Sequence, residues 1–222
     1  MVQVLNLLEL FSGTGIVSKT AREMGWETFT VDSSPKSGAD MTINILDLDP
    51  KKLKFIPDVI WSSPPCTTYS IAGISYHRER NSPRSVAAYV SDAVVLKMQE
   101  IIKYFLDKNP GLIFYIENPR GSLRKMPFMD VGEHLFTQNR IELPFRTTVT
   151  YCQYGSRWMK PTDIWHNDSV WTPRPMCHKG DPCHEAAPKG SHKGCDNGNL
   201  TAGQRGVVPV ELIQDLLRGK LS

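Results

Sequence analysis

Three short segments of the chain combine reactive or polar side chains with turns that would expose them. The first, WSSPPCTTYS at residues 61–70, contains Cys66 directly after two prolines. The prolines stiffen the backbone and would hold the thiol in position, where its thiolate could attack an electrophilic carbon. A lone cysteine is more often a small buried hydrophobic residue. This segment alone therefore does not indicate a reaction, and other reactive residues must lie near Cys66 for that interpretation.

The second segment, YIENP at residues 115–119, places a carboxyl group at the end of an apolar run. Glu117 in that position could hold or transfer a proton. Asn118 and Pro119 could instead simply open a helix, because both residue types are common at helix starts. Taken alone, the segment is better explained as a helix cap.

The third segment, FSGTG at residues 11–15, is a glycine turn that follows a predicted strand. Its glycines would let backbone N–H groups approach a ligand closely, although a tight strand-to-helix connection explains the same pattern. Asp32 ends a second predicted strand about 20 residues later, which is where nucleotide-binding α/β proteins bind the ribose hydroxyls. The turn and the carboxylate together indicate a nucleotide-type ligand.

The elements that must position these residues alternate between strands and helices. Apolar residues at helical spacing predict helices at 16–24, 86–106 and 209–217. Apolar or alternating runs predict strands at 4–10, 28–31, 41–46, 58–62, 112–116, 149–151 and 162–165. This alternation predicts an α/β fold with a parallel sheet, whose ligands gather at the carboxyl ends of the strands.

The composition excludes several classes of protein. The chain has 222 residues, a formal charge of +3, 40% hydrophobic residues and 22% charged residues, as in an ordinary globular protein. Disorder would need fewer apolar residues, and a membrane span would need about 18 apolar residues in a row. The N-terminus carries no signal-peptide pattern, so we expect a cytoplasmic protein. Five cysteines, an odd number, argue against a secreted disulfide framework.

Taken together and in order, these segments resemble the DNA cytosine-C5 methyltransferase family. LFSGTG at 10–15 matches the family's S-adenosylmethionine motif, PPC at 64–66 its nucleophile motif, and EN at 117–118 its Glu-Asn motif. The resemblance covers residues 4–166 and the C-terminal helix, and it is strongest to the short stand-alone members of bacteriophages and prophages. It implies the Rossmann-like fold of S-adenosylmethionine-dependent methyltransferases, a mostly parallel sheet with helices on both faces.

The resemblance also implies the organisation of the chain and its partners. Residues 1–171 would be the catalytic domain, 172–203 a short target-recognition region rich in Cys, His, Gly and Pro, and 204–222 a helix that returns to the catalytic domain. The cofactor would be S-adenosylmethionine, with S-adenosylhomocysteine as its product. The partner would be double-stranded DNA, with the target cytosine rotated out of the duplex. We expect a monomer without a membrane partner, in the host cytoplasm if the protein is phage-encoded.

In the chemistry that the family implies, Cys66 adds to carbon 6 of cytosine and thereby activates carbon 5. Glu117 neutralises the charge that develops on the ring by acting at N3. Carbon 5 then takes the methyl group, a base removes its proton, and Cys66 departs. The family pattern places further cytosine contacts at Ser63, Pro65, Asn118 and Pro119.

For the cofactor, the adenine contact falls at Asn44 and Ile45. Asn44 stands where the family usually has Asp, but its side-chain carbonyl can still accept a hydrogen bond from the adenine amine. The family pattern gives the remaining cofactor contacts to Phe11, Gly13, Gly15, Asp32, Pro64, Arg205 and Gly206.

The chain departs from the family where Gln-x-Arg-x-Arg is usual. YGSRWMKPT at 154–162 puts Lys160 at one arginine position and Arg157 nearby. Either cation could contact the nucleic acid, although Lys lacks the planar fork of Arg, and solvated surface cations are the alternative. In the family the loop after the nucleophile closes over DNA. The basic stretch 71–85, with Arg78 and Arg80, would suit that role.

The recognition region contains the side chains of a possible zinc site. Five residues separate Cys177 from Cys183, which His184 follows, and eleven residues separate Cys183 from Cys195. These side chains could bind zinc tetrahedrally, although the spacing matches no standard zinc finger. The alternative is that the thiols and imidazoles are free and face solvent or DNA.

Two other functions stay open. The altered motif at 154–162 is compatible with an RNA cytosine methyltransferase, and the small recognition region with a catalytically silent DNA-binding protein. The presence of both Cys66 and Glu117 favours an active DNA methyltransferase.

Overall fold

The computed structural model describes residues 4–131, 141–178, 180–185 and 206–220, and these contain a seven-stranded sheet of order β3-β2-β1-β4-β7-β9-β8. The strands are β1 (Asn6–Leu10), β2 (Glu27–Asp32), β3 (Met41–Thr42), β4 (Val59–Ser62), β7 (Ile113–Pro119), β8 (Phe145–Thr150) and β9 (Pro161–His166). Strands β3, β2, β1, β4 and β7 are parallel, whereas β9 is antiparallel to both of its neighbours. The prediction of a mostly parallel α/β sheet is therefore confirmed.

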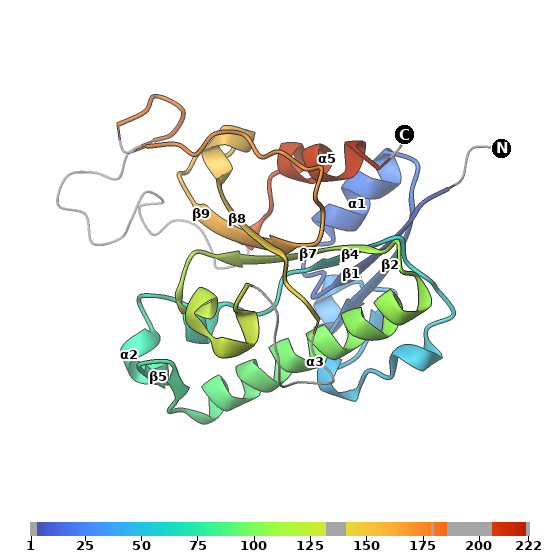
Figure 1. Ribbon diagram of the computed structural model, residues 1–222, viewed down its shortest axis with the longest axis horizontal. Coiled ribbons are helices and arrows are strands. Elements are labelled where there is room, and N and C mark those ends of the chain that lie inside the picture. Colours follow the sequence, from blue (N-terminus) through green and yellow to red (C-terminus); the bar gives the residue numbers. More distant parts are fainter. Residues whose placement is uncertain (1–3, 132–140, 179, 186–205, 221–222) are drawn as a thin grey trace.

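Helices cover both faces of this sheet, as predicted (Figure 1). They are α1 (Ile16–Glu23), α3 (Val86–Lys108) and α5 (Val210–Arg218). Helices α1 and α5 lie together on one face, where Leu212 and Leu216 of α5 share an apolar core with Val17 of α1. Helix α3 covers the other face and buries Met98 and Ile102 there. Among the described residues, no helix has the length and apolar character needed to cross a membrane.

Strand β7 is longer than the sequence pattern predicts. The apolar run ends at residue 116, but the strand continues through Glu117 and Asn118 to Pro119. The extension forms because β9 pairs with it in antiparallel fashion, with Glu117 opposite Ile164 and Asn118 opposite Asp163. Both polar residues are therefore held inside the sheet, and the alternative of a helix cap at Asn118 is wrong.

Two other strands differ from their predicted extents because short 3-10 helices interrupt them. Strand β3 stops at Thr42, since the Asn44 side chain accepts a hydrogen bond from the backbone N–H of Leu46 and opens the helix η2 (Ile45–Asp47). Strand β8 runs from Phe145 to Thr150 and gives way to the helix η7 (Tyr151–Tyr154).

The basic stretch 71–85 is folded against the domain. It consists of the short helix α2 (Ile74–His77) and a hairpin of β5 (Arg78–Glu79) and β6 (Ser82–Pro83). Arg78 is buried, pairs with Asp92 of α3 at 2.6 Å, and donates to the Thr68 carbonyl at 3.1 Å. The prediction that Arg78 contacts DNA is wrong, because its guanidinium is enclosed and already paired. Arg80 is exposed, so its DNA contact stays a prediction.

We expect Arg78→Ala to lower the free energy of unfolding by about 3 kcal/mol, because it removes a fully enclosed guanidinium and leaves the half-buried Asp92 with the Tyr69 hydroxyl but without its ion-pair partner. The matched control is Arg84→Ala in the same segment, where the side chain is exposed and the loss should stay within about 0.5 kcal/mol. Urea unfolding of both variants measures the difference. Equal stabilities would contradict the structural role of Arg78.

Candidate active site

The carboxyl ends of β1, β4 and β7 meet at one cavity of about 390 Å³, a size typical of small-ligand sites. The lining of the cavity includes these residues that the sequence pattern indicates: Phe11, Gly13, Ser63, Pro64, Pro65, Cys66, Glu117, Pro119, Lys160 and Gly206. The structure therefore brings the three segments, which are distant in sequence, to a single site. Arg205, by contrast, lies outside the described residues.

The glycine turn has a backbone conformation that favours glycine. Phe11, Gly13 and Gly15 have φ values of 60°, 52° and 65°, in the left-handed region that side chains disfavour. A Cβ atom on Gly13 or Gly15 would meet no atom closer than 3.9 Å, so the conformation, and not crowding, explains the glycines. The Gly15 N–H donates to the Ser12 carbonyl at 2.7 Å and closes the turn at the start of α1.

Asp32 is anchored to this turn. One carboxylate oxygen accepts from the Gly13 N–H at 2.9 Å and the other from the Ser34 N–H at 2.7 Å. Within the described part of the chain, Asp32, Asn44 and Ile45 do not line the cavity: Asn44 caps η2, and Ile45 is buried in the core. The cofactor contacts expected of these residues stay predictions from the family resemblance.

Cys66 lies at the start of the short 3-10 helix η4 (Thr67–Tyr69), after a proline turn that is held from two sides. The Asn118 amide donates to the Pro64 carbonyl at 2.9 Å, and the Trp61 indole donates to the Ser63 hydroxyl at 2.9 Å. Cys66 is exposed at the cavity, but partial desolvation of its thiol and the nearby charge of Glu117 raise its pKa. Lys160 acts in the opposite direction and lowers this pKa.

Glu117 is buried in β7, and its carboxylate accepts a hydrogen bond from the Tyr151 hydroxyl at 2.7 Å. Burial and the Glu117 charge raise the pKa of Tyr151, which keeps the phenol protonated as the donor. The Lys160 ammonium lies 4.6 Å from the centre of the Tyr151 ring. Sequence reasoning missed this role of Tyr151, because its position beside Glu117 depends on the pairing of distant strands.

Glu9 is a second residue of the cavity that sequence reasoning missed. It lies in β1 with 2% of its surface exposed, and its carboxylate accepts from the backbone N–H of Ser18 at 2.9 Å. Burial raises its pKa to about 7. The available signal was a charged residue within a largely apolar predicted strand.

Arg157 does not line the cavity formed by the described residues. Its exposed guanidinium pairs with Glu185 and lies 4.7 Å from the centre of the Trp158 ring. Lys160 is half-buried and points its charge toward Tyr151 and Cys66. Of the two predicted cations, Lys160 is therefore the one at the candidate site.

Comparison with known proteins found one informative sequence relative, whereas no protein-family model matches the chain. The chain is 29% identical over 187 residues to a probable DNA (cytosine-5)-methyltransferase of Frog virus 3 (isolate Goorha), with 79% of this chain and 76% of the relative covered. This similarity agrees with the family resemblance that the three motifs indicate.

Two solved structures are also similar. The Dnmt2 methyltransferase of S. pombe has a TM-score of 0.49 and 13% identity, and the match covers 77% of this chain and 52% of that one. The methyltransferase EhMeth of Entamoeba histolytica has a TM-score of 0.48 and 13% identity, with 81% and 57% covered. This chain thus spans little more than half the length of either protein.

The charges around Cys66 predict opposite shifts of its pKa. We expect Glu117→Gln to lower the pKa of the thiol and Lys160→Met to raise it, since each variant removes one of the two opposing charges. The pH dependence of alkylation by iodoacetamide, corrected with Cys66→Ala for the other thiols, measures both shifts. Lys103→Met on the surface of α3 is the control and should leave the profile unchanged. Identical profiles for all variants would contradict this electrostatic assignment.

The raised pKa of Glu9 predicts a pH-dependent stability. Because the folded protein holds the Glu9 proton up to about pH 7 and the unfolded chain only to about 4.5, the wild type loses stability as the pH rises through this window. Glu9→Gln stays neutral and should gain relative stability over the same window, up to about 3 kcal/mol. Urea unfolding of both proteins at pH 5 and 8 would measure it, and a pH-independent difference would disprove it.

Proposed function

We propose that this protein is a DNA cytosine-C5 methyltransferase. The observation that carries the proposal is the meeting of Cys66, Glu117 and the glycine turn at one cavity, from three separate strand ends. A thiol nucleophile and a carboxyl group on opposite segments are what addition to a pyrimidine ring requires. The named function of the viral relative supports the same reaction. In this proposal residues 1–171 and 204–222 catalyse, and 172–203 recognise the target.

The residues at the glycine turn fit S-adenosylmethionine. Phe11, Gly13, Pro64 and Gly206 line the cavity, and Asp32 holds the turn from the side of β2. The buried Glu9 adds a carboxylate to a lining that is otherwise largely apolar, which suits a cationic ligand once Glu9 is ionised. S-adenosylmethionine, when bound, supplies an electrophilic methyl group.

Cys66 and Glu117 would act together on the target cytosine. As the Cys66 sulfur bonds to carbon 6, electrons move into the ring, and a proton shared between Glu117 and ring N3 neutralises them. Carbon 5 then has the nucleophilic character needed to accept the methyl group. Loss of the carbon 5 proton to a base returns the electrons, and the Cys66 sulfur leaves carbon 6.

The electrostatics of the free site couple these two residues. Desolvation of the thiol and the Glu117 charge raise the pKa of Cys66, so the thiol keeps its proton while the site is empty of nucleic acid. Uptake of a proton from solvent, shared between Glu117 and ring N3 of the bound cytosine, would remove much of that charge, and Lys160 would then favour the thiolate. Tyr151 would fix the Glu117 carboxylate through its hydrogen bond. The nucleophile would thus be activated only when its target is in place.

A second candidate substrate is RNA cytosine. The observation that favours it is Lys160, which lies at the cavity where the family usually has arginine. A lysine offers a point charge in place of a planar fork, so the contact to the nucleic acid differs from the family pattern. A catalytically silent DNA-binding protein would be the third outcome.

The test uses purified protein with labelled S-adenosylmethionine and cytosine-containing duplex DNA, RNA, or duplex DNA carrying 5-fluorocytosine. We expect methyl transfer to duplex DNA and a covalent adduct with the fluorinated duplex, because fluorine at carbon 5 cannot be lost as a proton. Cys66→Ala should abolish both, and Glu117→Gln should slow transfer roughly 10²- to 10⁴-fold.

Each outcome selects one function. Transfer to RNA alone would contradict the DNA substrate while keeping the reaction, and DNA binding without transfer or adduct would indicate the silent protein. Lys103→Met, remote from the cavity, is the matched control and should keep wild-type activity.

A further inference from the structure

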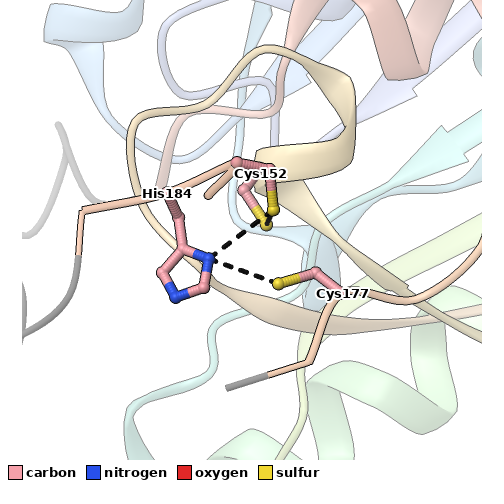
Figure 2. A group of neighbouring side chains, drawn as sticks. Cys152, Cys177 and His184 are labelled. Carbon is pink, nitrogen blue, oxygen red and sulfur yellow. Dashed lines mark hydrogen bonds between the residues drawn. The ribbon is translucent and has the colours of Figure 1, made fainter. Parts of the chain in front are cut away.

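Four side chains that the methyl-transfer site does not use converge at the end of β8. They are Cys152 in η7, and Cys177, Cys183 and His184 in the segment that follows β9. Their ligand atoms all lie within 4.8 Å of one another. Figure 2 shows Cys152, Cys177 and His184 pointing toward one another from different parts of the chain. The sequence pattern suggested three of these residues, but it missed Cys152 and included Cys195, which lies outside the described residues.

Three of the six separations between the ligand atoms are close to those around a tetrahedral zinc ion, and all six are within 4.8 Å. With zinc–sulfur and zinc–nitrogen bonds of about 2.3 and 2.0 Å, two sulfurs would be about 3.8 Å apart, and a sulfur and a nitrogen about 3.5 Å apart. The Cys183 and Cys152 sulfurs are 3.7 Å apart. The His184 Nδ1 atom is 3.3 Å from the Cys177 sulfur and 3.6 Å from the Cys183 sulfur.

The chemistry of the four residues is selective. Three thiols and one imidazole form a Cys3His set, which suits zinc, whereas magnesium and calcium prefer oxygen ligands. A disulfide would need a sulfur separation of about 2.05 Å, far shorter than the 3.7 Å between Cys183 and Cys152. A structural zinc site is therefore the better explanation of the cluster.

Neighbouring groups hold two of these residues in position. The Cys177 N–H donates to the Thr150 hydroxyl at 3.0 Å, and the Gln153 amide donates to the Cys183 sulfur at 3.3 Å. Arg174 fastens the same segment to η7 by donating to the Gln153 carbonyl at 2.6 Å. The cluster is thus supported by contacts that do not need a metal.

The segment gains from a metal because it has little apolar packing. Among the described residues from 172 to 185, Cys177 alone is buried. Metal ligation can supply the folding energy that such a segment lacks. Cys152 directly follows Tyr151, the hydrogen-bond partner of Glu117, so a metal here would join this segment to the wall of the cavity.

We propose that Cys152, Cys177, Cys183 and the Nδ1 atom of His184 bind one structural zinc ion. Binding would convert the three thiols to thiolates and release their three protons to solvent. The site is closed by four protein ligands, so it would hold the fold and take no direct part in methyl transfer. The proposal is independent of the proposed function.

The first experiment measures zinc in the wild-type protein, purified under reducing conditions without chelator, by elemental analysis. We expect about one zinc per chain. Replacement of the zinc with cobalt(II) should give two kinds of absorption band: thiolate-to-cobalt charge-transfer bands and the visible d–d bands of a tetrahedral site. Less than about half an equivalent of zinc after refolding with zinc chloride, or a cobalt spectrum without thiolate bands, would overturn the proposal. Neither the zinc content nor the cobalt spectrum requires enzymatic activity or a variant for its measurement.

Variants then identify the ligands. Cys183→Ser and His184→Ala should lose most of the zinc, whereas His184→Cys should retain it, because it keeps four ligands of the right kind. Cys195→Ser and His178→Ala are the matched controls and should keep about one equivalent. Loss of zinc from Cys195→Ser, with retention in a folded Cys183→Ser, would show that the ligand set is wrong.

Discussion

Strand β7 carries the constraint on which the site depends, because it buries a carboxylate and an amide inside a sheet. Glu117 and Asn118 are buried where β7 pairs with β9, so their polar groups depend on partners within the protein. The Tyr151 hydroxyl donates a hydrogen bond to Glu117, and the Asn118 amide donates one to the Pro64 carbonyl. These two hydrogen bonds also fix η7 and the turn that carries Cys66. The geometry of the cavity thus depends on one hydrogen bond to each of these buried side chains, while the Asn118 side-chain oxygen has no partner among the described residues.

Paired charges support this arrangement at its edge. Arg124 contacts both carboxylate oxygens of Asp163, at 2.9 and 2.6 Å, and Asp163 lies opposite Asn118 in the sheet. On the other side, Arg78 and Asp92 fasten the hairpin that follows Cys66 to α3. A bidentate pair between Arg and a carboxylate fixes orientation as well as distance. The loops around the cavity are therefore held by directional contacts in addition to apolar packing.

The sequence predicts the sheet and the three motifs because those signals are local. Alternation of apolar runs gives the strands, and the carboxyl ends of parallel strands meet, which places Phe11, Cys66 and Glu117 together. The missed features depend on distant pairing: Tyr151 reaches Glu117 only because β8 and β9 extend the sheet beyond β7. The burial of Arg78 was missed for a similar reason, since a basic stretch looks like a surface loop until α3 is packed against it.

The backbone of Phe11 has a consequence for how freely this site could change. A residue with a side chain in the left-handed region stores about 1 kcal/mol or more of strain, and here the strained residue lines the cavity. Glycine at this position would relax the backbone but would remove an aromatic ring from the binding surface. Stability therefore favours glycine at position 11, whereas ligand affinity favours phenylalanine. This trade-off limits the substitutions that can be accepted there.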